Sequence, residues 1–136
     1  MGNFVGGVMK KFDKDMNSPL AKVFLEVRDC IIQNISDDKN NIIEKFTDNL
    51  TSYYSKEFDS GFCYIRVKDD YVHVGWFQGA LIKDIPNLLF GNGRVLRGQK
   101  IKKVSKIEEK AIKYYIEQTK IIMIEKSEKK QIKKML

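Results

Sequence analysis

Two segments of alternating side chains, residues 62–68 and 71–77, constrain the fold of this chain more than any other feature. They flank Asp69 and Asp70, and a two-residue turn at these aspartates would pair them as the antiparallel strands of a hairpin. Strand side chains alternate between the two faces of a sheet, so this register sorts them completely. One face is then entirely apolar and consists of Cys63, Ile65, Val67, Val72, Val74 and Trp76. A three-residue turn would mix the two sets, so we predict the two-residue turn and a buried apolar face.

The other face of the predicted hairpin carries aromatic and basic side chains and the single histidine of the chain. Its members are Phe62, Tyr64, Arg66, Lys68, Tyr71, His73, Gly75 and Phe77. Two interpretations are open at this point. In the first the face packs on itself, with Tyr64 shielding the backbone of Gly75 and Arg66 lying over a tyrosine ring as a cation–π pair. In the second it docks a planar ligand, or the aromatic or acidic groups of a partner protein.

The composition is typical of a single globular domain. With 136 residues, of which 43% are hydrophobic and 32% charged, the chain can form one core and is too apolar for wholesale disorder. No apolar run approaches the roughly 20 residues that cross a bilayer, and the N-terminus lacks the order of a secretory signal. We therefore expect a cytoplasmic protein with no membrane partner. Two cysteines without C-x-x-C spacing indicate reduced core thiols, and we expect no resident metal or other cofactor.

Helical periodicity brackets the hairpin on both sides. Ser18 as N-cap and Pro19 as the first helical residue predict a helix that ends near Asn34. A second helical pattern covers residues 42–50, although residues 50–55 could instead begin the sheet. After the hairpin we predict a possible helical turn at residues 86–90 and a third strand over residues 95–102.

The pair Ser105 and Glu108 forms a capping-box pattern, which predicts the start of a long C-terminal helix. Its predicted buried side consists of Ile107, Ala111, Tyr115, Gln118 and Ile122. Residues 1–17 are expected to be a flexible leader or a short, weakly docked helix, and residues 126–136 a basic end that frays into solvent. The domain then spans residues 18–125. We predict an α+β sandwich, a small antiparallel sheet with the N- and C-terminal helices packed on one face.

The segment from Phe62 onward resembles the YdhG-like proteins, a bacterial domain of unknown function. The resemblance rests on FCYIR at residues 62–66, on GWFQGA at residues 75–80, on LLFGNGRVLR at residues 88–97 and on Lys100-Ile101. It extends over about residues 18–118 and is strongest over residues 61–112. The resemblance implies a frataxin-like fold, and because one branch of the family has been treated as an iron chaperone, it permits an iron-related role.

We predict a non-enzymatic binding or carrier module that acts through the uncovered hairpin face and the basic run that follows. The predicted ligand-binding residues are Tyr64, Arg66, Tyr71, His73, Phe77, Arg94, Arg97 and Lys100. The expected partner is a protein or a small anionic or planar ligand. Catalysis is not expected, because no nucleophile or orienting acid is predicted beside His73 and Cys63 points to the opposite face.

Two alternatives are kept open. An iron chaperone would need clustered carboxylates, for which the predicted first helix offers only Glu26 and Asp29. The other acids, Asp37, Asp38, Glu44 and Asp48, are more simply capping and solvated residues. A binder of single-stranded nucleic acid would stack bases on the rings and neutralise phosphates with the cations. The chain has no RNP-type motif, and the acidic stretch at residues 35–59 would repel a polyanion if it lay close to the rings.

Overall fold

The computed structural model describes residues 7–35, 42–47 and 49–136. The helices are α1 (Gly7–Met16), α2 (Ala21–Ile35), the short 3-10 helix η2 (Gly79–Leu81) and α3 (Lys106–Met135). The strands are β1 (Ile42–Phe46), β2 (Thr51–Ser55), β3 (Ser60–Val67), β4 (Val72–Trp76), β5 (Leu89–Phe90) and β6 (Arg97–Ile101). They form one antiparallel sheet in the order β1-β2-β3-β4-β6-β5. The predicted α+β class is confirmed.

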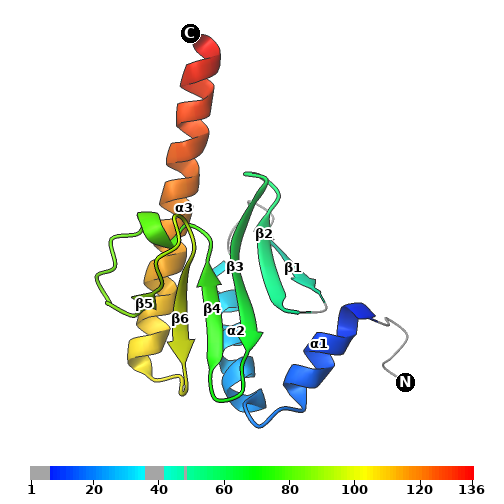
Figure 1. The fold of residues 1–136 in the computed structure, drawn as a ribbon. Helices are drawn as coiled ribbons and strands as arrows, with labels where there is room; N and C mark the ends of the chain where they lie inside the picture. The colour runs from blue at the N-terminus through cyan, green and yellow to red at the C-terminus, as the bar shows by residue number, and fades with distance from the viewer. Residues whose placement is uncertain (1–6, 36–41, 48) are drawn as a thin grey trace.

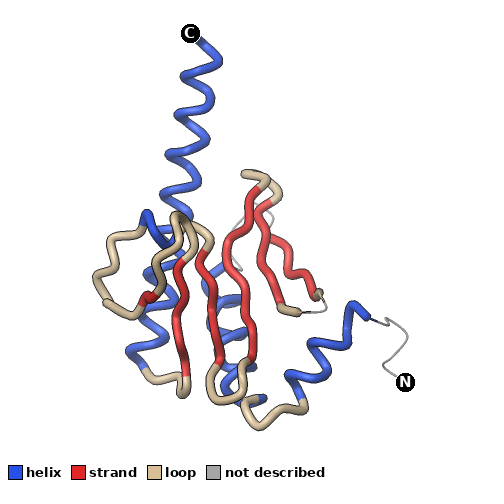
Figure 2. Tube along the Cα trace, in the orientation of Figure 1, coloured by secondary structure: helices blue, strands red, loops and turns tan. Residues whose placement is uncertain are grey.

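The helices and the sheet form two layers. Helices α2 and α3 pack on each other behind the sheet, and the face of the sheet toward the viewer is covered by no described helix (Figures 1 and 2). Within the described residues, no helix combines the length and the apolar character needed to span a membrane.

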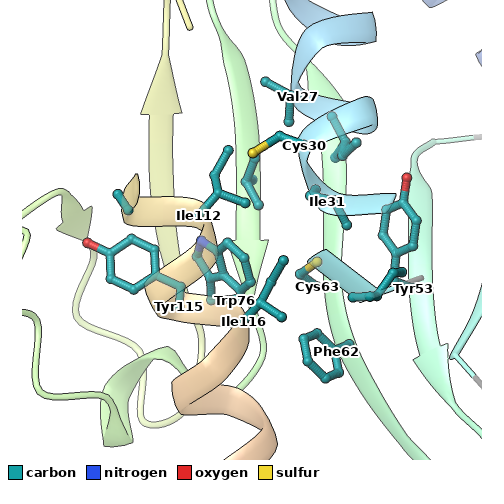
Figure 3. Packing of buried hydrophobic residues seen from close by; sticks show 14 of the residues in the cluster. Val27, Cys30, Ile31, Tyr53, Phe62, Cys63, Trp76, Ile112, Tyr115 and Ile116 are labelled. Atoms are coloured by element: carbon teal, nitrogen blue, oxygen red, sulfur yellow. The ribbon is translucent and has the colours of Figure 1, made fainter. Parts of the chain in front are cut away.

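The predicted hairpin register is confirmed in full. Arg66 pairs with His73 and Tyr64 with Gly75, and the Lys68 N–H donates to the Tyr71 carbonyl at 2.8 Å across the aspartate turn. The side chains fully buried (0% exposed) on the helix side of this hairpin are Cys63, Ile65, Val72, Val74 and Trp76. Figure 3 shows the Trp76 indole against α3, where its ring centroid lies 5.5 Å from that of Tyr115.

Phe62 corrects one detail of this prediction. The β2–β3 register shifts by one residue, since Tyr53 pairs with Cys63 and Tyr54 with Gly61, and Phe62 is left without a partner on β2. Such a bulge re-aims a side chain. The Phe62 ring is 1% exposed and lies among the core residues (Figure 3), so its prediction for the uncovered face is wrong.

Two local predictions are also wrong. Residues 42–46 form strand β1 instead of a helix and pair with β2, which confirms the alternative in which residues 50–55 belong to the sheet. The helical periodicity of three or four apolar residues is overridden here by pairing with the neighbouring strand. Residues 86–90 contain no helical turn, because the Asp84 carboxylate accepts the N–H groups of Asn87 and Leu89 at 2.9 Å each and directs the chain into β5.

The first and the last elements that the structure describes are helices. In α1, which occupies much of the expected leader, the Phe12 ring packs edge-on against Phe24 and Phe46, with centroids 5.8 and 4.8 Å apart. At the other end α3 starts after Ser105 as predicted and continues to Met135, projecting beyond the body of the molecule (Figure 1). The expected fraying of residues 126–136 stays a prediction.

The buried arc of α3 differs from the predicted one. It is made by the adjacent pairs Ala111 and Ile112, Tyr115 and Ile116, and Ile122 and Met123, with Thr119 between them. Ile107 is 66% exposed, so its predicted burial is wrong, and Gln118 lies at the margin. The arc is centred about half a residue later than the predicted stripe, and at 3.6 residues per turn this leaves Ile107 outside it.

Alanine substitution distinguishes the two arcs. We expect Ile112→Ala to lower the free energy of unfolding by about 2–5 kcal/mol, because it leaves a cavity between α3 and the sheet. Ile107→Ala is the matched control on the same helix and should change stability by less than about 0.5 kcal/mol. Urea denaturation of both variants measures the difference, and equal losses would contradict the observed arc.

Candidate functional site

The uncovered side of the sheet, called the open face below, is defined by strand register and by the approach of rings to glycines. Its strand positions are Ile43, Lys45, Ser52, Tyr54, Gly61, Tyr64, Arg66, His73, Gly75, Phe90, Gly98 and Lys100. Lys68, Tyr71 and Phe77 extend it just beyond the strand ends. None of the described strand positions on this face is an acid.

A continuous row of rings crosses the open face. Tyr64 on β3 lies 5.5 Å from Phe77 and 5.6 Å from His73, and His73 on β4 lies 5.7 Å from Phe90 on β5, measured between ring centroids. The Tyr64 hydroxyl is also 3.2 Å from His73 Nε2, within hydrogen-bonding distance. The row therefore links side chains from three strands, β3, β4 and β5.

Glycines let these rings lie directly on the backbone. A methyl group built at Gly75 would be 2.1 Å from the Tyr64 ring, and one at Gly98 would be 2.4 Å from His73 and 2.9 Å from Phe90. Rings that cover glycine in this way stabilise a sheet. The packing interpretation of Tyr64, which is 9% exposed, is thus supported, while Phe90 remains 44% exposed at the end of the row.

The cations of the open face lie over rings. Lys45 Nζ is 4.8 Å from the centroid of Tyr54, and Lys100 Nζ is 4.6 Å from Tyr71. Arg66 Cζ is 5.7 Å from Tyr64. Among the described residues no carboxylate lies within ion-pair distance of these three cations.

The acid nearest in sequence to this face points away from it. Glu44 lies on the helix side of β1, where Arg28 donates two hydrogen bonds of 2.8 Å to its carboxylate and the Tyr53 hydroxyl donates one of 2.7 Å. This arrangement raises the pKa of Arg28, chiefly through the hydrogen bond to Glu44. Glu44 is thus committed to the core side and does not offset the charge of the open face.

His73 is held neutral at physiological pH. Its pKa is lowered below the ordinary 6.5, first by burial and then by the charges of Lys68 and Arg66. Its Nδ1 and the Arg66 Nε are buried and have no hydrogen-bond partner among the described residues. Unpartnered polar atoms of this kind are uncommon in folded proteins and are frequent at functional sites.

Two predicted residues lie elsewhere. Arg97 pairs with Trp76, which faces the helices, and its Nη1 donates to the carbonyls of Gly93 and Leu96. It thus closes the loop before β6 and does not share the face of Lys100. Arg94 is exposed in that loop. The structure brings together the remaining predicted residues, which are Tyr64, Arg66, Tyr71, His73, Phe77 and Lys100.

Phe90, Lys45 and Tyr54 are members of the face that the sequence analysis missed. Phe90 falls in the loop segment with a predicted helical turn at residues 86–90. Lys45 falls in the segment predicted as a helix, and Tyr54 falls in residues 50–55, where the beginning of the sheet is the open alternative. The run of alternating residues at 51–55 was a usable signal, since it places Tyr54 on one side of a strand and Tyr53 on the other.

The part of the chain that the structure describes contains no group of three side chains of the kinds that could hold a metal ion. Glu26 and Asp29 line a shallow hollow together with Glu109, Lys110 and Lys113. Asp37, Asp38 and Asp48 lie outside the described residues.

Neither thiol is activated as a nucleophile. Burial raises the pKa of Cys30 to about 11, and burial also raises the pKa of Cys63 well above its ordinary value. Both side chains are therefore thiols at neutral pH, and a reactive cysteine would need a lowered pKa.

Comparison of the chain with protein-family models, with curated proteins and with solved structures finds no match. The resemblance to the YdhG-like proteins thus stays a prediction, and the argument about function rests on the geometry of the open face.

A double-mutant cycle tests the packing of Tyr64 on Gly75. Gly75→Ala alone should cost about 1–3 kcal/mol of stability, because its methyl would overlap the ring. In a Tyr64→Ala background the same change should cost close to nothing. Urea denaturation of the four proteins gives the coupling energy, and additive costs would contradict direct contact.

His73 gives the fold a dependence on pH. Its lowered pKa means that the unfolded chain binds the proton more readily, so the contribution of the neutral imidazole is complete above pH 6.5 and declines as the pH falls below that value. We expect the stability difference between wild type and His73→Gln to shrink from pH 7.5 to pH 5. A difference that is constant or grows on acidification would contradict this.

Proposed function

We propose that this chain is a cytoplasmic, non-enzymatic binding module that holds an anionic ligand with planar groups on its open face. One observation carries the proposal: the cations Lys45, Arg66 and Lys100 lie over rings and face no described carboxylate. We also propose that the chain belongs to the YdhG-like family, whose members would share this sheet.

The cation–π contacts do not prevent the cations from binding an anion. An exposed cation–π contact contributes about 0.5–1 kcal/mol and an exposed ion pair about 0.2–1 kcal/mol, so the exchange of one for the other changes the free energy little. A polyanion that meets several of the cations at once also releases counterions and gains more in total. The rings that remain offer apolar area to the planar part of the ligand.

The chemistry of the site supports binding over catalysis. His73 is neutral and contacts Tyr64, the neighbouring charges are Arg66 and Lys68, and both cysteines are buried. Iron delivery has no comparable support, because the best-placed carboxylate, that of Glu44, is occupied by Arg28 and Tyr53.

Charge-matched variants test the proposal with inorganic polyphosphate as the probe. We expect Lys45→Gln, Arg66→Gln and Lys100→Gln combined to weaken binding at low salt by about tenfold or more, and to reduce the slope of log K against log salt by about 2. The control combines Lys106→Gln, Lys110→Gln and Lys113→Gln, exposed positions of α3 on the other side of the molecule.

Both triple variants lower the net charge by the same amount. The control therefore shows how much of the lost affinity comes from the lower overall charge alone. Titration by fluorescence anisotropy or calorimetry measures the affinities. Equal losses in the two triple variants, or no binding by the wild type, would overturn the proposal.

A further inference from the structure

We infer that the anionic planar ligand of the open face is single-stranded nucleic acid, an inference that rests on the proposed function and names its ligand class. The juxtaposition behind it is a row of aromatic rings interleaved with cations on a sheet face whose described strand positions include no acid. Binding of single strands on such a surface combines base stacking with neutralisation of the phosphates.

The rings are held in position before any ligand arrives. Tyr64, seated on Gly75 and almost fully buried, fixes the positions of Phe77 on one side and His73 on the other. Phe90, seated on Gly98, continues the row and is 44% exposed. Tyr64 is thus a positioning residue, while Phe90, together with the partly exposed Phe77, supplies surface on which a base can stack.

Cations lie along the same row. Arg66 lies over Tyr64, and Lys100 lies between Tyr71 and Phe90, 4.6 and 5.7 Å from their centroids. A strand whose bases cover Phe77 and Phe90 would place the phosphates between them near these cations. Rings and cations thus lie side by side on the open face, within reach of the bases and the phosphates of one strand.

The acids that would repel a polyanion are positioned away from the row or are paired. Glu44 is on the opposite face in its ion pair with Arg28. At the margins of the sheet, Asp59 accepts the hydroxyl of Tyr54, and Asp70 lies 4.0 Å from Lys102. Of the acidic stretch, Glu44 therefore faces away from the row, whereas Asp59 lies at the margin of the open face beside Tyr54.

The rings select single strands over other polyanions. In a duplex the flat faces of the bases are already stacked on one another, so only the phosphates could use the site. An acidic peptide would use the cations but has no regularly spaced planar groups for the rings. The ligand that uses both parts of the face is an unpaired strand.

The experiment compares three probes of equal phosphate number: a labelled twelve-nucleotide oligothymidylate, an abasic strand of the same length, and inorganic polyphosphate. We expect the oligothymidylate to bind about tenfold or more tightly than the abasic strand, since stacking contributes about 1–3 kcal/mol per base. Phe90→Leu, which keeps an apolar side chain and removes the aromatic face, should reduce that preference about fivefold or more. Val95→Ala, at an exposed residue of the loop that follows β5, is the control and should leave that preference unchanged.

Each outcome decides a different statement. Equal affinity for the oligothymidylate and the abasic strand, with loss of both in the Lys45, Arg66 and Lys100 triple variant, would overturn the nucleic-acid inference and leave the anion-binding function standing. Absence of binding to all three probes would overturn both. A preference for bases that survives Phe90→Leu and also Phe77→Leu would place nucleic-acid binding elsewhere on the molecule. Thermal unfolding of each variant confirms that it is folded.

Discussion

Burial of Trp76 and its neighbours beneath α2 and α3 is the interaction on which the rest of the molecule depends. The indole is fully enclosed, and its N–H donates to the Gln99 side chain on β6 at 3.2 Å, which ties the central hairpin to the third strand of the predicted meander. Each large apolar side chain buried in this way stabilises the fold by about 1.5–3 kcal/mol. Because side chains alternate along a strand, enclosing Trp76 also determines that Tyr64, Arg66 and His73 lie on the other face.

The open face serves two purposes that are usually separated. Its rings cover glycine backbone and so contribute to stability, and the same rings present area beside cations that have no acidic partner among the described residues. Packing of the face on itself and docking of a ligand are thus compatible, since a ring already held on glycine loses little conformational entropy when a ligand binds. The free energy of ordering the site is supplied by folding.

The parts of the structure that could be predicted from the sequence depend on short local patterns. The Asp69-Asp70 turn set the hairpin register, and the pair Ser105 and Glu108 located the start of α3. The bulge at Phe62 and the seat of Phe90 on Gly98 depend on how two strands pair with each other, which the side-chain pattern of either strand alone does not indicate. The prediction that Arg97 and Lys100 act together on one face conflicts with the predicted strand over residues 95–102, because residues three apart in a strand point to opposite faces.

The length of α3 has a consequence of its own. At 1.5 Å per residue its 30 residues span about 45 Å, yet its buried side chains end at Met123, and its next tie to the sheet layer is the hydrogen bond from Lys126 to the Gln78 side chain at 2.8 Å. A helical segment of this size has little stability without packing. The outer turns can therefore unwind and re-form in water while the sheet stays intact, so that the molecule comprises one cooperative unit and one appendage with its own, much lower, free energy of opening.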